Sequence, residues 1–179
     1  VRGMVRDFAR RELTPHVRDW DARAHFPRDV FARLGELGLL GILVPEELGG
    51  AGLTYRHYIA VLEELGAVEG GVALSVAAHN SLCTNHLLLF GSDAQRRRWL
   101  PGLASGRVLG AWGLTEPEAG SDAGGTRTTA RRDGGAWVLE GSKSFITHAS
   151  VGGVAVITAR TSPGGDHRGI SAFVVPLAT

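Results

Sequence analysis

The sequence is poor in the residues that build disulfides and metal centres. Cys83 is its only cysteine, so neither an intrachain disulfide nor a thiolate cluster can form, and a reducing compartment is expected. The seven histidines follow no ligand spacing, which argues against a metal site. The formal net charge of +1 leaves no basic excess to neutralise phosphates, so nucleic acid is not expected as a partner.

Long apolar runs are also absent. The longest, Leu37 to Val44, is far short of the roughly 20 residues that span a bilayer, and no secretory signal opens the chain. We therefore expect a cytoplasmic protein with no membrane contact. Lys143 is the only lysine, which we interpret as a compositional bias toward arginine. Neither end of the chain looks natural, and we expect a fragment that lacks a C-terminal part.

The first part of the chain has the apolar spacing of helices. Met4, Val5 and Phe8 begin an amphipathic stripe, which Pro15 should interrupt. The segment from Val72 to Phe90 is apolar nearly all round, which predicts a buried central helix. The segment from Ser92 to Gln95 is a capping box that opens a further helix. We expect an α-helical domain over residues 1–108.

The pattern changes to strands and turns near Val108. Asp133-Gly134-Gly135 is typical of a hairpin turn, and residues 162–166 are expected to form a loop. We therefore expect an antiparallel β domain over residues 109–179, and an α+β chain overall. The candidate strands are residues 108–115, 126–132, 136–140, 143–147, 154–160 and 170–175.

One stretch, from Trp112 to Asp122, has the character of a binding site. A strand-like run breaks at Pro117 and leads into the small residues Ala119-Gly120-Ser121-Asp122. Such a bend can turn backbone N–H groups toward one anion, and Thr115 and Ser121 add hydroxyls. This arrangement suits a flat heteroaromatic cofactor that carries phosphates. The alternative is an ordinary β-turn with no ligand.

Two other nucleotide motifs are not supported. No G-x-G-x-x-G occurs, so the Rossmann mode of dinucleotide binding is not expected. The segment from Gly141 to Ser144 lacks the glycine that immediately precedes the lysine of a P-loop. In the expected central helix, His79, Asn80 and His86 are either hydrogen-bonded polar groups of the core or part of a ligand pocket.

Two motifs in register resemble one known family. Thr115-Glu116-Pro117 followed by Ala119-Gly120-Ser121-Asp122 resembles the flavin-binding motif of the acyl-CoA dehydrogenases, and the segment Gly141 to Thr147 resembles the family's next flavin strand. The similarity covers essentially the whole chain. Further segments resemble most the short-chain acyl type: residues 80–81, 121–124, 128–131, 137–139 and 169–173.

The resemblance implies FAD as the cofactor and assigns its contacts. Thr115 and Thr147 would hydrogen-bond the isoalloxazine ring, with Thr147 near the nitrogen that accepts hydride. Ser121 would approach both the pyrophosphate and the acyl-CoA. His148 stands where the family usually has Asn. The full set of implied cofactor contacts is Trp112, Gly113, Leu114, Thr115, Gly120, Ser121, Phe145, Ile146 and Thr147.

The family fold is a helical domain, a barrel-like middle β domain and a C-terminal helical bundle, which we expect to be missing here. The implied activity is oxidation of an acyl-CoA to a trans-2-enoyl-CoA in fatty acid β-oxidation, with electrons passed to an electron-transfer flavoprotein. The catalytic carboxylate would lie in the missing bundle, so no catalytic residue is expected in this chain, and the chain alone should be inactive. The full-length protein would be a homo-oligomer, such as a homotetramer. The alternatives are a flavin monooxygenase or oxidase on the same fold, or a non-catalytic relative.

Overall fold

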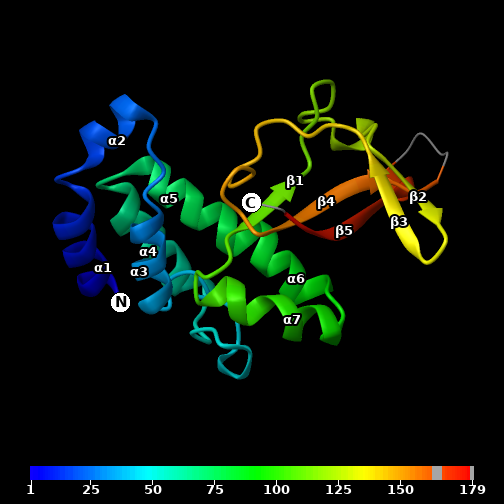
Figure 1. Cartoon of the computed structure of the whole chain (residues 1–179). Coiled ribbons are helices and arrows are strands. Elements are labelled where there is room, and N and C mark those ends of the chain that lie inside the picture. The colour runs from blue at the N-terminus through cyan, green and yellow to red at the C-terminus, as the bar shows by residue number, and fades with distance from the viewer. Residues whose placement is uncertain (163–166, 178–179) are drawn as a thin grey trace. The chain divides into compact units, whose positions relative to one another are not determined.

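The computed structural model describes residues 1–162 and 167–177, which divide into two compact units, Val1–Leu109 and Gly110–Thr179 (Figure 1). Residues 163–166 of the expected loop lie outside the described residues. The first unit is helical, as predicted. Its elements are α1 (Arg2–Phe8), η1 (Ala9–Leu13), α2 (Val17–Arg23), α3 (Arg28–Glu36), η2 (Glu46–Leu48), α4 (Tyr55–Gly66), α5 (Gly70–Ala77), η3 (Ala78–Thr84), α6 (Asn85–Phe90) and α7 (Asp93–Ala104).

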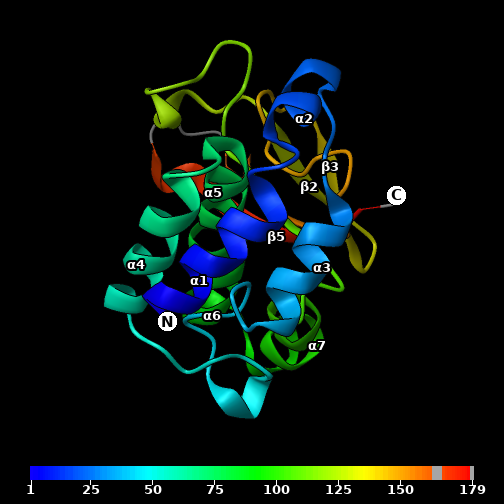
Figure 2. The same cartoon turned by 90° about the vertical axis from the view of Figure 1, so that its left-hand side faces the viewer.

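Local signals explain several helix ends in this unit. The first helical run stops before Pro15, and α2 begins only at Val17. This is the expected effect of a residue that lacks a backbone N–H and clashes with the preceding turn. The capping box of α7 is confirmed, because Ser92 N donates to Gln95 Oε1 at 2.8 Å and Gln95 N donates to Ser92 Oγ at 3.3 Å. Helices α1 and α4 lie side by side (Figure 2).

The predicted central helix forms, but it is not buried on all sides. Helices α5, η3 and α6 follow one another without a break from Gly70 to Phe90. Val76 and Cys83 are fully buried, whereas Leu74 is 64% exposed and Phe90 is 75% exposed. A helix that is apolar all round needs packing partners on every side, and the described residues of this unit supply them on one side only.

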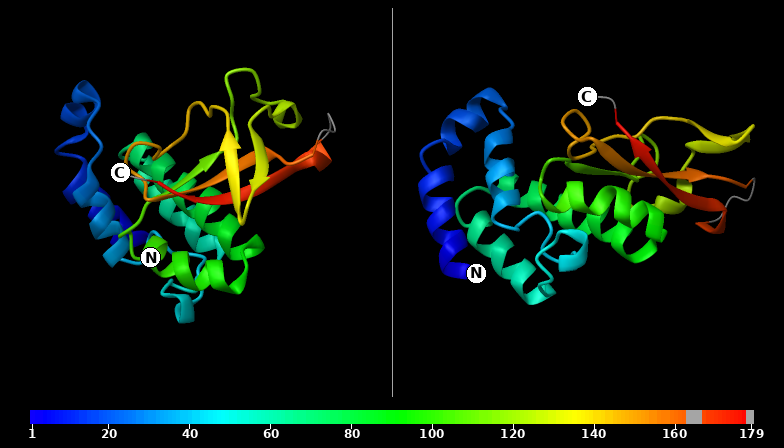
Figure 3. Two further views of the ribbon diagram at one scale, coloured as in Figure 1. Left: turned by 45° about the vertical axis from the view of Figure 1, so that its right-hand side comes forward. Right: turned by 60° about the horizontal axis from the view of Figure 1, so that its bottom comes forward.

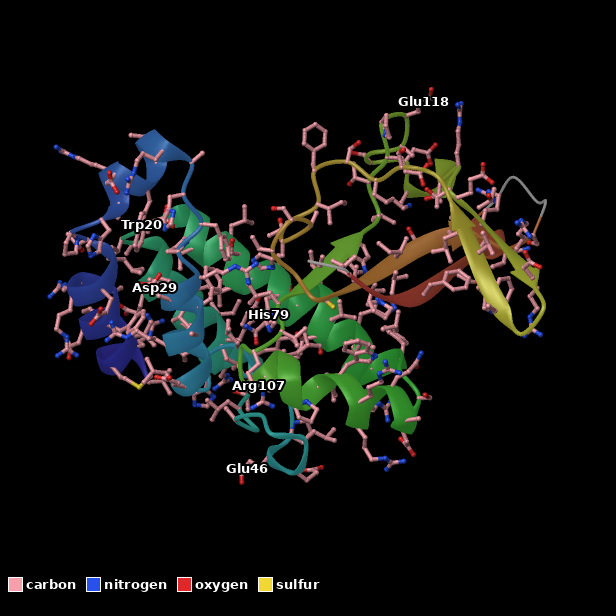
Figure 4. The ribbon with its side chains drawn as sticks, viewed as in Figure 1. Trp20, Asp29, Glu46, His79, Arg107 and Glu118 are labelled. Carbon is pink, nitrogen blue, oxygen red and sulfur yellow. The ribbon has the colours of Figure 1, made fainter. Side chains whose placement is uncertain are left out.

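Two polar side chains tie this helix to the rest of the helical unit. Asn80 Nδ2 donates to Leu39 O at 3.0 Å and to Val76 O at 3.1 Å, while its Oδ1 accepts from Ile42 N at 3.2 Å. His79 lies within the helical unit (Figure 4), with Nε2 3.1 Å from Leu103 O. Both residues are therefore hydrogen-bonded polar groups of the core, which was the first of the two interpretations offered by the sequence.

The second unit is a sheet of five strands, with two 3-10 turns, η4 (Ala123–Gly125) and η5 (His167–Gly169). Strand β4 pairs along its whole length with β5, and its other edge pairs with β1 at Val154–Ile157 and with β2 at Arg160. Figure 3 shows β5 alongside β4 and the β2–β3 hairpin. The strands are β1 (Gly110–Gly113), β2 (Thr129–Asp133), β3 (Ala136–Glu140), β4 (Val154–Arg160) and β5 (Ile170–Pro176).

The expectation of an antiparallel, barrel-like domain needs correction. The pairs β1–β4 and β2–β4 are parallel, while β2–β3 and β4–β5 are antiparallel, so the sheet is mixed. The described strands form an open sheet, not a closed barrel. Strand alternation in a sequence gives no information on strand direction, because that depends on which distant strands meet. The hairpin turn is confirmed: Asp133 pairs with Ala136, and Gly134 has φ of 58°.

Candidate functional site

The first motif forms a strand end followed by a tight turn. After β1 the chain continues through Leu114 and Thr115 to a turn in which Glu116 N donates to Ala119 O at 2.9 Å and Ala119 N donates to Glu116 O at 3.2 Å. Pro117 takes the second position of this turn, where its fixed φ is favoured. Glu118 lies at the outer end of the loop (Figure 4) and pairs with the exposed Arg127.

The Glu116 carboxylate is buried and accepts three hydrogen bonds. Glu116 is 6% exposed and accepts from Arg127 N at 2.6 Å, Thr128 N at 3.0 Å and Lys143 Nζ at 2.7 Å. Burial opposes ionisation of this group, but the hydrogen bonds from Lys143 and from the two backbone N–H groups outweigh it and hold the pKa at about 2. Glu116 is therefore a fixed anion inside the sheet unit.

Lys143 joins that anion to the end of β1. Its ammonium also donates to Leu114 O at 3.0 Å and to Thr158 Oγ1 at 3.2 Å, and Thr158 Oγ1 donates in turn to Gly113 O at 3.2 Å. Gly113 makes room for this arrangement, because a Cβ there would lie 3.3 Å from Lys143 Cγ and 2.6 Å from Ile157 Cδ1. The three donors of the ammonium thus have three acceptors.

Composition alone does not describe Lys143, because its ammonium is nearly buried and makes three hydrogen bonds. The signal was available in the sequence, because the only lysine of an arginine-rich chain lies inside one of the two motifs. Lysine is a compact ammonium on a flexible stem, whereas the planar guanidinium of arginine is a different shape. The buried position beside Glu116 suits a compact cation, which is a physical reason for a lysine at this one place in an arginine-rich chain.

The second motif lies beside the first but is not a strand. Ser144 N donates to Thr115 O at 2.9 Å, and Gly141, with φ of 152°, approaches Thr128 so closely that a Cβ would lie 2.7 Å from Thr128 Cα. The predicted strand 143–147 is wrong, because no strand includes these residues and Phe145 has φ of 57°. β-propensity, which suggested the strand, is overridden here by contacts with distant residues.

The predicted contact residues divide into two groups. Gly113, Leu114 and Thr115 are brought next to the segment that carries Phe145, Ile146 and Thr147, through the bonds of Lys143 and Ser144. Gly120 and Ser121 are exposed, lie beyond the Glu116–Ala119 turn, and make no hydrogen bond to either segment among the described residues. Trp112 is half-buried, and its indole Nε1 is buried with no acceptor in the part of the chain described.

Several groups on this surface fit a polar, planar ligand such as FAD. The hydroxyls of Thr115, Ser121 and Thr147 have no hydrogen-bond partner among residues 1–162 and 167–177. A Cβ at Gly120 would meet nothing within 4 Å, so a ligand can approach the backbone there. The Phe145 ring is 96% exposed although the residue adopts a left-handed conformation that L side chains rarely occupy. Strained residues of this kind cluster at binding sites.

His148 has a structural place beside this surface. It is buried, and its Nδ1 is 3.0 Å from Gly110 O, which fixes the turn after Thr147 to the start of β1. Burial lowers the pKa of this imidazole, although the bond to Gly110 opposes that change. The unusual residue at this position is thus accommodated as a neutral side chain.

No cluster of His, Cys, Asp or Glu among the described residues could hold a metal ion. Within those residues, no helix has the length and apolar character needed to cross a membrane.

Comparison with known proteins gives the family. The model of the acyl-CoA dehydrogenase N-terminal domain matches residues 1–107, and that of the acyl-CoA dehydrogenase middle domain matches residues 111–179. A probable acyl-CoA dehydrogenase of Bacillus subtilis is 46% identical over 100% of this chain and 47% of its own length. The rat mitochondrial short-chain specific acyl-CoA dehydrogenase is 43% identical over 100% of this chain and 43% of its own length. The chain belongs to the acyl-CoA dehydrogenase family.

One similar solved structure contains a flavin cofactor. The chain resembles the crystal structure of a glutaryl-CoA dehydrogenase from Mycobacterium smegmatis in complex with FADH2, with 37% identity and a TM-score of 0.91, over 98% of this chain and 44% of the other. FAD, the cofactor expected from the sequence, is the cofactor of that relative. The chain spans about half the length of the curated relatives it matches.

Proposed function

We propose that the whole protein is an FAD-dependent acyl-CoA dehydrogenase that oxidises the α,β C–C bond of a short acyl-CoA to a trans-2-enoyl-CoA. The observation that carries this proposal is the contact between residues 113–115 and 141–147, which brings the two flavin-motif segments side by side and leaves the Phe145 ring 96% exposed. FAD, when bound, supplies the acceptor for the hydride.

In this proposal the chain's own residues bind and orient the two ligands. Thr115 and Thr147 donate their hydroxyls to the ring system, and Trp112 and Phe145 pack beside it. Gly113, Leu114 and Ile146 form the adjoining surface, while Gly120 and Ser121 receive the pyrophosphate. Ser121 also contacts the acyl-CoA. The indole N–H of Trp112 supports its assignment, because it is buried without an acceptor among the described residues, whereas buried polar groups are normally paired.

The two carboxylates of the first motif, Glu116 and Glu118, do not suit the removal of the substrate's α-proton. A general base needs a pKa near the working pH, whereas Glu116 has a pKa of about 2, is 6% exposed and accepts three hydrogen bonds from the protein. Glu118 is paired with Arg127 on the surface. We therefore propose that the base is supplied from outside residues 1–179.

Partners and oligomeric state are proposed from the family resemblance, and the location from the single cysteine and the lack of a secretory signal in the sequence. We propose an electron-transfer flavoprotein as the electron acceptor, a homo-oligomeric state such as a tetramer, and a cytoplasmic location. A flavin monooxygenase or oxidase on the same fold remains the second candidate, and a relative without flavin the third. The indole N–H of Trp112, buried without an acceptor among the described residues, and the exposed, left-handed Phe145 favour a flavin-binding protein over the third.

The test uses the full-length protein. It should be yellow, with flavin absorbance that is bleached when butyryl-CoA is added without oxygen. Ser121→Asp should weaken flavin retention on gel filtration through bulk and charge repulsion, whereas Ser171→Asp, on the exposed side of β5, should not. A protein that binds flavin but is not reduced by any acyl-CoA would favour the monooxygenase alternative. A colourless protein that cannot be reconstituted with FAD would overturn the proposal.

A further inference from the structure

The buried pair of Glu116 and Lys143 joins separate parts of the candidate site. Glu116 holds Arg127 and Thr128 through their backbone N–H groups, while Lys143 holds the carbonyl of Leu114 and the hydroxyl of Thr158. The side chains of Lys143 and Glu116 are only 9% and 5% exposed. One ion pair therefore fixes the end of β1, the approach to β2 and the second motif segment.

We propose that Glu116 and Lys143 are positioning residues that set the geometry of the flavin-binding surface, an inference that rests on the proposed function. The segment 141–147 has no strand ladder to hold it. Among the described residues, its hydrogen bonds to the first motif are those of Lys143 to Leu114 and Glu116 and the bond from Ser144 N to Thr115 O. Without Lys143, the segment keeps the Ser144 bond and the contact of His148 with Gly110 O, but it loses the side-chain link to Leu114 and Glu116 that sets how the segment lies against the first motif.

Energetics distinguish this role from a contribution to stability alone. Replacing a buried ion pair with apolar groups of similar volume is often neutral for stability, whereas removing one partner is costly because the other charge is left unpaired. A neutral replacement of both residues therefore separates the two roles. It should restore stability without restoring the three-way connection that the ammonium makes with Leu114, Glu116 and Thr158.

The experiment compares the full-length wild type with Lys143→Met, with the double variant Glu116→Gln/Lys143→Met and with Arg131→Met. Arg131 pairs with Asp133 on the surface of the hairpin, at 63% and 62% side-chain exposure, and serves as the control. Three quantities are measured: the melting temperature of the apoprotein, the Kd for FAD by titration, and the visible circular dichroism of the bound flavin.

Lys143→Met should lower the melting temperature and raise the Kd for FAD by about 10-fold or more, the scale seen when a residue that orients a binding group is lost. The double variant should recover most of the melting temperature but keep the raised Kd and an altered visible circular dichroism. Arg131→Met should match the wild type in all three measurements.

The outcomes separate the inference from the proposed function. If the double variant regains both the wild-type Kd and the wild-type visible spectrum, the pair is only structural and the inference is wrong, while the proposed function stands. If the wild type binds no FAD, the proposed function is wrong and the inference falls with it.

If the double variant does not fold, Thr158→Val provides a second test of the inference. It removes one acceptor of Lys143 without any change of charge. We expect a smaller rise in Kd, of about 2- to 5-fold, and an altered visible spectrum. Wild-type values for both would overturn the inference.

Discussion

Each unit of the molecule has a carboxylate whose pKa is lowered to about 2, yet the two are built differently. In the helical unit Glu64, on α4, pairs with Arg6 and Arg2 of α1, whose side chains are 50% and 54% exposed. The hydrogen bond from Arg6 is the main cause of its lowered pKa. In the sheet unit Glu116 pairs with Lys143, which is almost fully buried.

The comparison shows that a lowered pKa does not measure structural importance. Arg2 and Arg6 are wetted cations that can substitute for one another, and exposed ion pairs contribute little to stability. Among the described residues Lys143 is the one side-chain cation that donates to Glu116, and the two side chains are only 9% and 5% exposed. The first pair joins two helices, whereas the second defines the geometry of an irregular segment.

The largest expected effect is that of Glu116→Ala. It leaves the Lys143 ammonium buried without its counter-charge and two backbone N–H groups without an acceptor, which should destabilise the protein by about 3–5 kcal/mol. Urea unfolding of the full-length protein measures this loss. The matched control is Glu118→Ala in the same loop, whose side chain is 61% exposed and whose removal should cost within about 0.5 kcal/mol. Equal losses of stability for the two variants would show that the buried Glu116 matters no more than the exposed Glu118.

Asn80→Ala should have the next largest effect. The side chain is 2% exposed and makes three hydrogen bonds, two of which join the central helix to Leu39 and Ile42 while the third reaches Val76 O within the helix. Loss of these partners should cost about 1–3 kcal/mol, measured by the same unfolding assay. Asn85→Ala, which removes an exposed bond to the Tyr55 hydroxyl, is the control. If the helical unit depends only on apolar packing, the two variants will behave alike.

The stability of the protein at acid pH should depend on both carboxylates. Their folded-state pKa values of about 2 lie below the ordinary value of 4.5, so each carboxylate stabilises the fold above about pH 4.5, and this contribution is lost as the pH falls toward 2. Glu64→Gln removes one titrating group. Its stability should therefore fall less steeply between pH 4.5 and 2 than that of the wild type, as measured by unfolding at a series of pH values. Parallel curves would show that Glu64 is not held ionised.

The smallest effect is expected for Arg6→Met. Arg2 still contacts Glu64 at 3.1 Å, so the loss should be small, and it should shrink further in high salt. Unfolding with and without added sodium chloride tests this expectation. A loss as large as that of Glu116→Ala, or one insensitive to salt, would show that the helical pair is also desolvated.

The sequence predicted those parts of the molecule that depend on neighbouring residues. The break at Pro15, the capping box at Ser92 and the hairpin turn at Gly134 are short-range effects and are all confirmed. The helical character of the first unit follows from apolar spacing in the same way. The motif residues around Glu116 also led to the family that the comparisons give.

Features that depend on distant residues were not predictable in this way. The parallel pairing of β1 with β4 joins residues more than forty positions apart, such as Gly110 and Val154. The segment 143–147 has strand-forming residues, but Lys143 is drawn toward Glu116 and Leu114 and the backbone turns at Phe145. The role of Lys143 is likewise visible only when its partners are in place. The assignment of individual flavin contacts stays a prediction.

The burial of Lys143 also has a chemical consequence. It is the only side-chain amine of these 179 residues, and the other strongly basic groups on the surface are guanidinium groups, which are poor nucleophiles at neutral pH. Thioesters such as acyl-CoA can acylate free amines, and the one side-chain amine of this chain is only 9% exposed. An amine-directed reagent would modify Lys143 only when the segment around it opens, so its rate of labelling would time that opening. Labelling as fast as that of free lysine would show that the amine is already accessible.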